Sequence, residues 1–202
     1  MRNLFVAAWV GACLLKLLIV ARLPLFVDEA FYWQEGRHLA PAYSDLPGLT
    51  AWLARLGTAI GGNHELALRL PFLVVAAGLP WLVVPIAARE FDARAGWIAG
   101  LAAVLLPLAG TLGLLALPDA TMALATLLCM DAGARLLRNV DAGASLELAA
   151  GLAIGALSHY RFIAVIGVGL LALLLMPEGR RALRDIRTWI AIAFGAAAWT
   201  PL

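Results

Sequence analysis

Three short stretches of this chain carry side chains whose types and spacing could support chemistry. Asp28 and Glu29 are adjacent and follow an apolar run, Asp119 lies in a short break between two apolar runs, and residues 159–161 (HYR) interrupt a third. A carboxylate close to a membrane surface and within reach of an acceptor hydroxyl can act as a general base. The alternative for both aspartates is structural, because each is also placed to cap the helix that follows it.

The run His159-Tyr160-Arg161 is a candidate cation site. An arginine guanidinium matches the oxygens of a phosphate in a bidentate way. Arg161 beside His159 would therefore suit a lipid phosphate, and the alternative is a solvated turn. Lys16 and Arg69 lie where a long side chain can reach outward to the membrane interface, so we expect both to be structural.

A metal site has less support in the sequence. Asp119 could share a pocket with Asp28 and either hold a metal ion or orient the first acid. No His or Cys accompanies Asp119 at ligand spacing. A hard divalent cation with oxygen ligands is possible, but no specific metal and no other cofactor is indicated. Cys13 and Cys129 each lie inside an apolar run, and we expect both to be buried, inert thiols.

The composition indicates that these residues belong to a membrane protein. Of 202 residues, 63% are hydrophobic and 14% are charged, whereas soluble domains average about 45–50% apolar and about 25% charged residues. Such an excess cannot be buried in one soluble core and must face lipid. The net charge of only +2 gives no support for a nucleic-acid partner.

Apolar runs along the chain predict an all-α, polytopic transmembrane bundle of about six to seven spans, since one span needs about 20 apolar residues. The runs cover residues 4–23, 66–88, 97–115, 121–137 and 148–176, and a last run begins near Trp189.

The run over residues 148–176 decides the expected topology. As a single helix it would bury His159 and Arg161 near the bilayer centre, where an arginine costs about 2.5–3.5 kcal/mol. Two short helices with a turn at residues 159–161 avoid that cost. This arrangement also gathers most arginines on one side, and because positive loops stay cytoplasmic, the N-terminus is expected to be cytoplasmic. Those arginines are Arg2, Arg89, Arg94, Arg135, Arg138, Arg180, Arg181, Arg184 and Arg187.

The external segment over residues 24–65 is expected to contain two helices that lie in the outer membrane interface. Asp28 is placed to cap a helix over residues 29–39, which Pro41 would stop. Pro47 could open a second, amphipathic helix that ends at Gly61-Gly62. This topology places the chemically competent side chains on one non-cytoplasmic face, namely Asp28, Glu29, Glu35, Asp45, Asp119, His159, Tyr160 and Arg161.

Helical spacing separates the two adjacent acids. Asp28, Tyr32 and Glu35 would share one face of the first external helix, whereas Glu29 would point elsewhere. We therefore expect Asp28 and Glu29 to have different roles.

Five motifs, in this order, carry a resemblance to a known family. They are residues 24–33 (PLFVDEAFYW), 43–53 (YSDLPGLTAWL), 68–71 (LRLP), 117–120 (LPDA) and 157–161 (LSHYR). Together they resemble the bacterial family 39 and 83 glycosyltransferases of the GT-C superfamily, which includes protein O-mannosyltransferases and lipid A aminoarabinose transferases. The DEAFYW stretch after a first span is the most specific of these motifs.

The resemblance implies an inverting transfer of a sugar from a polyprenyl-phosphate donor at the periplasmic face of a bacterial inner membrane. The acceptor would be a lipid, a glycan or a protein, and membrane lipids would surround the enzyme. By this resemblance Asp28 is the base and Asp119 a second acid of the cavity. Glu29, Tyr32, Asp45, His159, Tyr160 and Arg161 would contact the substrates, and Arg161 would face the donor phosphate.

The chain departs from the family pattern at three places. Asp45 is followed by Leu46-Pro47-Gly48 instead of the frequent His-Pro-Pro, and His159 stands where many relatives carry Lys. Family members run to several hundred residues, so we expect residues 1–202 to be the N-terminal part of a transmembrane domain, truncated in its seventh span. The alternatives are a transporter, a lipid-carrier-binding module without catalysis, a structural membrane subunit or an inactive transferase fragment.

Overall fold

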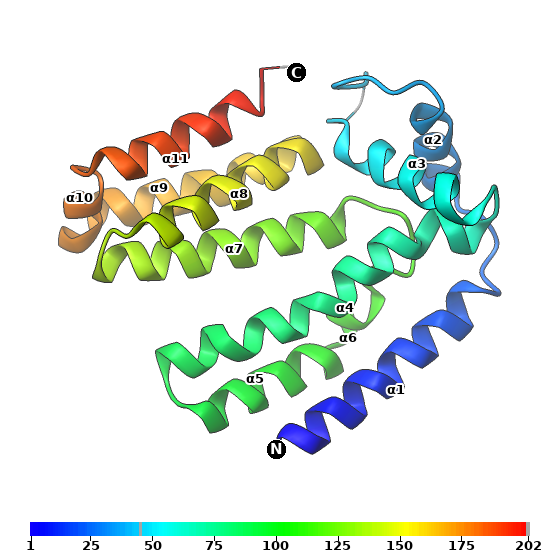
Figure 1. Ribbon diagram of the computed structural model, residues 1–202, viewed down its shortest axis with the longest axis horizontal. Coiled ribbons are helices and arrows are strands. Elements are labelled where there is room, and N and C mark those ends of the chain that lie inside the picture. The colour runs from blue at the N-terminus through cyan, green and yellow to red at the C-terminus, as the bar shows by residue number, and fades with distance from the viewer. Residues whose placement is uncertain (45, 201–202) are drawn as a thin grey trace. The chain divides into compact units, whose positions relative to one another are not determined.

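The computed structural model describes residues 1–44 and 46–200, and these residues form helices and no strand. Two compact units divide the chain. The first contains residues 1–39 and 50–120, and the second contains residues 40–49 and 121–202. The prediction of an all-α membrane helical bundle is confirmed (Figure 1). Asp45 lies outside the described residues.

The helices of the first unit follow one another with short connections. They are α1 (Arg2–Val20), α2 (Val27–Gly36), α3 (Leu49–Gly61), α4 (Glu65–Glu90), α5 (Ala93–Leu105) and α6 (Pro107–Thr111). The second unit contains α7 (Asp119–Arg138), whose first two residues belong to the first unit, and α8 (Ala142–Ser158). A 3-10 turn η1 (Tyr160–Phe162), α9 (Ile163–Leu175), α10 (Pro177–Ala182) and α11 (Ile186–Ala197) complete it.

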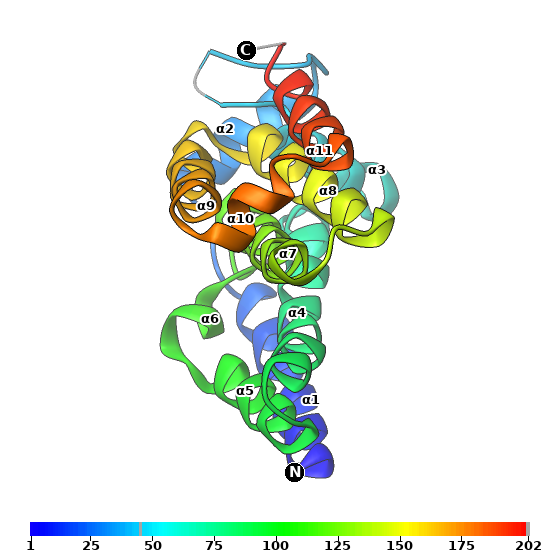
Figure 2. The ribbon, with the colours of Figure 1, turned by 90° about the vertical axis from the view of Figure 1, so that its left-hand side faces the viewer.

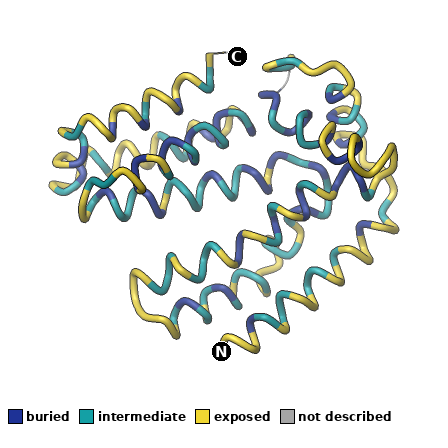
Figure 3. Tube along the Cα trace, viewed as in Figure 1, coloured by how far each residue is buried: buried dark blue, intermediate teal, exposed yellow. Residues whose placement is uncertain are grey.

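Three of the described helices, α1, α4 and α7, are long and apolar enough to cross a membrane, and α5, α8, α9 and α11 are shorter apolar helices. Large apolar side chains are exposed along α1, for example Leu14, Leu15 and Leu18. Figure 3 shows exposed residues of α1, in yellow, alternating with intermediate and a few buried ones. Such a surface is suited to lipid and not to water.

Aromatic side chains join α1, α4 and α5. The ring of Phe5 lies against Trp81 at 4.8 Å and against Trp97 at 5.5 Å between centroids. The indole of Trp9 donates a hydrogen bond to the carbonyl of Ala77 at 2.8 Å. The hydrogen bond satisfies the polar atom of the partly buried Trp9, as the membrane interior requires.

The expected span over residues 97–115 is wrong as a single helix. The helix α5 ends at Leu105, and Leu106 is extended because it precedes Pro107, which disfavours a helical residue before it. Lys16 then donates to the carbonyls of Ala109 (3.3 Å) and Leu112 (2.9 Å) around the end of α6. Lys16 is structural, as expected, but it binds backbone inside the unit.

The predicted break in the run over residues 148–176 is confirmed. Helix α8 ends at Ser158, His159 is extended, and α9 begins after the 3-10 turn. Figure 2 shows α8, α9 and α11 as separate rods of the second unit, and a shared core joins them. That core contains Leu148 and Leu152 of α8, Phe162 of the turn and Ala191 of α11.

Helix α3 begins at Leu49, two residues after Pro47, and Gly62 follows its end with a φ of 91°. Its buried face consists of small residues, including Ala51, Ala54 and Gly57, whereas Leu56 and Ile60 are exposed. A methyl group at Gly57 would overlap the carbonyl of Ala67 in α4. The small residues therefore permit close packing on α4, whereas Leu56 and Ile60 face outward and Leu53 packs partly against the core.

Candidate functional site

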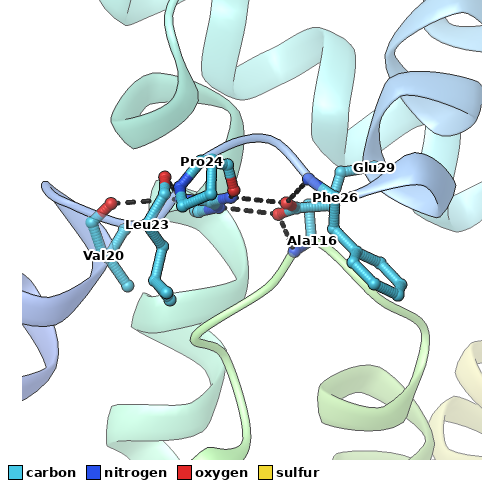
Figure 4. A network of polar contacts seen from close by, with 7 residues as sticks. Val20, Leu23, Pro24, Phe26, Glu29 and Ala116 are labelled. Atoms are coloured by element: carbon cyan, nitrogen blue, oxygen red, sulfur yellow. Dashed lines mark hydrogen bonds and ion pairs between the residues drawn. The ribbon is translucent and has the colours of Figure 1, made fainter.

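Glu29 is the third residue of α2, and its side chain is fully buried. Its Oε2 accepts a hydrogen bond from the backbone N–H of Phe26 at 3.0 Å, which closes the first turn of the helix. Its Oε1 accepts from the backbone N–H of Ala116 at 2.8 Å, 87 residues along the chain. Figure 4 shows the carboxylate between these two backbone segments. Glu29 thus joins the start of α2 to the loop before α7.

Arg69 of α4 is also fully buried and binds Glu29 through two parallel contacts. Its Nε donates to Oε1 at 2.7 Å and its Nη2 donates to Oε2 at 2.5 Å. This is the bidentate arginine–carboxylate geometry, which fixes direction as well as charge. The expectation that Arg69 reaches outward is therefore wrong: it points into the unit, although its role is structural as expected.

The remaining donors of Arg69 bind three backbone carbonyls where α1 ends. Nη1 donates to Val20 at 3.1 Å and to Leu23 at 2.9 Å, and Nη2 donates to Pro24 at 2.8 Å. A guanidinium has five N–H donors, and Arg69 makes five hydrogen bonds here. Burial of this cation leaves none of its donors unsatisfied, and its charge complements the negative end of the α1 dipole.

Burial alone raises the pKa of Glu29, because a low dielectric disfavours the charged carboxylate. The hydrogen bonds from Arg69, Ala116 and Phe26 act in the opposite direction and prevail, so the pKa of Glu29 is lowered. The pair is therefore ionised near neutral pH. Both carboxylate oxygens are occupied, so the structure offers substrate no open oxygen on Glu29, and the predicted contact of Glu29 with substrate finds no support here.

Asp28, the adjacent acid, is exposed. It is the second residue of α2, and Phe26 takes the N-cap position because Glu29 binds its N–H. The expectation that Asp28 caps this helix is therefore wrong. Asp28 and Glu29 therefore lie in different environments, and different roles for the two acids stay a prediction.

Asp119 is exposed and is the first residue of α7, three residues after Ala116. The hydrogen bond from Ala116 to Glu29 therefore ties the loop that leads to Asp119 to the turn that carries Asp28. Both aspartates belong to the first unit. Tyr32, one turn after Asp28, is buried, and its ring lies 5.9 Å from that of Phe31 between centroids.

His159, Tyr160 and Arg161 belong to the second unit. His159 is buried after the last residue of α8, and its Nδ1 accepts a hydrogen bond from the backbone N–H of Arg161 at 3.1 Å. Its ring contacts that of Tyr160 in a tilted arrangement, with centroids 4.3 Å apart and an interplanar angle of 56°. Tyr160 and Arg161 are exposed. His159 thus shapes the turn, and Arg161 presents its guanidinium on the surface of that unit.

No group of three or more His, Cys, Asp and Glu side chains within residues 1–44 and 46–200 is arranged to hold a metal ion. A role for a divalent cation stays a prediction of the sequence.

Two functional groups were missed from the sequence: the guanidinium of Arg69 as a partner of Glu29, and the backbone amide of Ala116. Arg69 lies within the LRLP motif and Ala116 directly before the LPDA motif, but neither motif states which residue it contacts.

Residues 45–202 match the family described as dolichyl-phosphate-mannose-protein mannosyltransferase. The chain belongs to this family. Its resemblance to GT-C glycosyltransferases is thereby confirmed. The match begins after Asp28 and Glu29 and covers α3 to α11, which includes Arg69, Ala116, Asp119 and the turn at His159.

A relative of this chain, the lipid A galacturonosyltransferase RgtD of Rhizobium johnstonii, is 29% identical to it over 173 residues. The alignment covers 83% of this chain and 36% of RgtD, so the chain spans about a third of the length of this relative. No solved structure matches the chain.

Proposed function

We propose that this chain is part of a membrane glycosyltransferase that transfers a sugar from a polyprenyl-phosphate donor to a hydroxyl of an acceptor, with inversion. The observation that carries the proposal is the buried Glu29–Arg69 pair, which fixes the turn bearing the exposed Asp28. Membership of the mannosyltransferase family supports the reaction class.

In the proposed reaction, Asp28 takes the proton from the acceptor hydroxyl while the oxygen of that hydroxyl attacks the anomeric carbon of the sugar. The bond between this carbon and the phosphate oxygen breaks, and the polyprenyl phosphate leaves with the bonding electrons. A single displacement of this kind inverts the configuration at the anomeric carbon. Asp28 needs a fixed position because a general base acts only within about 2.6–3.2 Å of the proton it abstracts, measured between heavy atoms.

Glu29 and Arg69 are positioning residues in this proposal. Their contacts with Phe26 and Ala116 hold the two backbone segments that carry Asp28 and Asp119, while neither side chain is accessible to substrate. Asp119 is the second acid, which orients Asp28 or the acceptor. Arg161 is proposed to bind the donor phosphate, whose growing negative charge a nearby cation would stabilise.

The name of RgtD states that it acts on lipid A with galacturonic acid. We therefore favour a glycolipid acceptor at the periplasmic face over a protein acceptor for this chain. The site would face the periplasm of a bacterial inner membrane, because the first external segment carries Asp28.

Transfer of a labelled sugar from a polyprenyl-phosphate donor to membrane glycolipid would test the base assignment. Asp28→Asn should lower the transfer rate by about 10²–10⁴-fold, the usual contribution of a general base. Glu65→Gln removes an exposed carboxylate from the first turn of α4 and should leave the rate unchanged. Wild-type turnover in Asp28→Asn would exclude Asp28 as the base.

Photo-crosslinking with a polyprenyl-phosphate analogue separates donor binding from catalysis. Labelling should persist in Asp28→Asn and fall in Arg161→Ala. A chain that is labelled but transfers no sugar would instead fit a lipid-carrier-binding protein without catalysis.

A further inference from the structure

Four arginines lie within eight residues at the junction of α9 and α11. They are Arg180, Arg181, Arg184 and Arg187, and all four are exposed. We call them the arginine band. The same segment contains two acids, Glu178 and Asp185, so positive charge prevails. Asp185 is partly engaged, because its Oδ1 accepts a hydrogen bond from the backbone N–H of Arg187 at 2.9 Å and caps α11.

Hydrogen bonds and close packing fix the turn that carries the arginine band. Nη1 of Arg180 donates to the carbonyls of Leu174 and Leu175, both at 3.0 Å, at the end of α9. A methyl group at Gly179 would overlap the backbone of Leu173, so α10 packs closely on α9 only because this residue is glycine. Figures 1 and 2 show α10 joining the same ends of α9 and α11. These contacts leave Arg181, Arg184 and Arg187 displayed on a defined turn.

Exposed apolar side chains run from the band along both adjoining helices. On α9 they include Leu171 and Leu175, and on α11 they include Ile190 and Phe194. Trp189 lies at the junction, 51% exposed, and its indole donates to the carbonyl of Leu183 at 2.7 Å. Helices that cross from the hydrocarbon to the lipid headgroups typically carry apolar side chains first, then tryptophan, then arginine. This order predicts that the arginines lie at headgroup depth.

We propose that the arginine band binds the phosphate groups of anionic phospholipids. The guanidinium fork matches a phosphate in a bidentate way, and basic residues beside a membrane span are attracted to anionic lipid. Arg181, Arg184 and Arg187 are the main contacts, because Arg180 uses one nitrogen on α9. This proposal is independent of the proposed transferase reaction, since it involves none of the residues of that site.

The test is the binding of phosphatidylglycerol to the purified chain, measured by native mass spectrometry from mixed micelles with phosphatidylcholine as the neutral competitor. The variant Arg181→Gln/Arg184→Gln/Arg187→Gln should bind phosphatidylglycerol roughly tenfold to a hundredfold more weakly, since each arginine near anionic lipid contributes about fivefold. Binding to the wild type should also weaken at 1 M salt, where charges are strongly screened.

The matched control is Arg22→Gln/Arg37→Gln/Arg55→Gln, which removes three exposed arginines of the first unit and the same total charge. It should keep the wild-type preference for phosphatidylglycerol. Equal loss in both variants would attribute binding to net charge and overturn the proposal, and so would an unchanged preference in the band variant.

A lysine variant and a competition with inorganic phosphate complete the test. The variant Arg181→Lys/Arg184→Lys/Arg187→Lys keeps the charge, so it should retain more phosphatidylglycerol than the glutamine variant. Equal loss in the two would show that positive charge at these positions does not bind the lipid and would overturn the proposal. Inorganic phosphate at millimolar concentration should not displace the lipid. A preference of the band for polyprenyl phosphate over phosphatidylglycerol would overturn the assignment to membrane phospholipid.

Discussion

The buried Glu29–Arg69 pair connects four backbone segments through two side chains. Its five arginine donors and both carboxylate oxygens are engaged. Replacing both members of such a pair by apolar residues often changes the stability of a protein little. Removing one member is costly, because the other charge is then buried without a partner. The two kinds of substitution therefore have different expected outcomes.

Arg69→Ala should lower the free energy of unfolding by about 3–5 kcal/mol, because it leaves the carboxylate of Glu29 buried without its cation. Denaturant unfolding in detergent would measure this. Arg69→Lys should restore only part of the loss, since an ammonium lacks the planar fork. The double variant Glu29→Ala/Arg69→Ala should lose less than the sum of the two single variants, and additive losses would contradict the pairing.

Glu29 should also make stability depend on pH in the acid range. Its pKa is lowered in the folded protein, so its contribution is present above the ordinary glutamate pKa of about 4.3 and is lost as the pH falls through the lowered value. The melting temperature of the wild type should therefore fall in acid more steeply than that of Glu29→Gln. Parallel curves for the two proteins would contradict this assignment.

The sequence was sufficient to separate Asp28 from Glu29, because helical spacing alone puts adjacent residues on different faces. It was not sufficient for Arg69. A long cation beside an apolar run is expected to reach water, and its partner lies 40 positions away on another helix. The predicted N-cap of α2 was wrong for a related reason. Glu29, and not Asp28, binds backbone at the start of the helix, because its side chain accepts the N–H of Phe26.

At the scale of elements, the breaks between helices depend on different physical causes. The break at His159 was predictable because a charged residue near the bilayer centre is costly. The break after Leu105 was missed because its cause is local backbone geometry at Pro107 within an otherwise apolar run. The buried face of α3 was also unexpected, since hydrophobic spacing identifies large side chains and not the small ones that permit close packing.

The turn at His159 depends on close packing between α8 and the residues that follow it. A methyl group at Gly155 would overlap the ring of Phe162. Gly155→Ala should therefore lower the free energy of unfolding by about 1–3 kcal/mol, the usual cost of overpacking. Gly167→Ala in α9 is the control, because nothing lies within 4 Å of an added methyl group there. Equal melting temperatures for the two variants would show that Phe162 can move without cost.

For the whole molecule, charge distribution supplies the expected orientation. The arginine-rich junction of α9 and α11 should be cytoplasmic, and the start of α4 should be external. In a Cys13→Ala/Cys129→Ala background, a membrane-impermeant maleimide added to spheroplasts should label Glu65→Cys directly. Arg181→Cys should react only after permeabilisation. The reverse pattern would contradict the expected orientation and the proposed periplasmic location of the site.

The partners of Arg69 have a consequence for biosynthesis. Every group that its guanidinium binds, from Val20 to Glu29, precedes it in the chain. When α4 leaves the ribosome, the chain that forms α1, the connecting segment and α2 has therefore already been made. The acceptors of Arg69 in these segments are present when Arg69 is synthesised. The amide of Ala116 arrives later and completes a site that the first four helices have assembled. All the acceptors of this buried charge are thus synthesised before the charge itself.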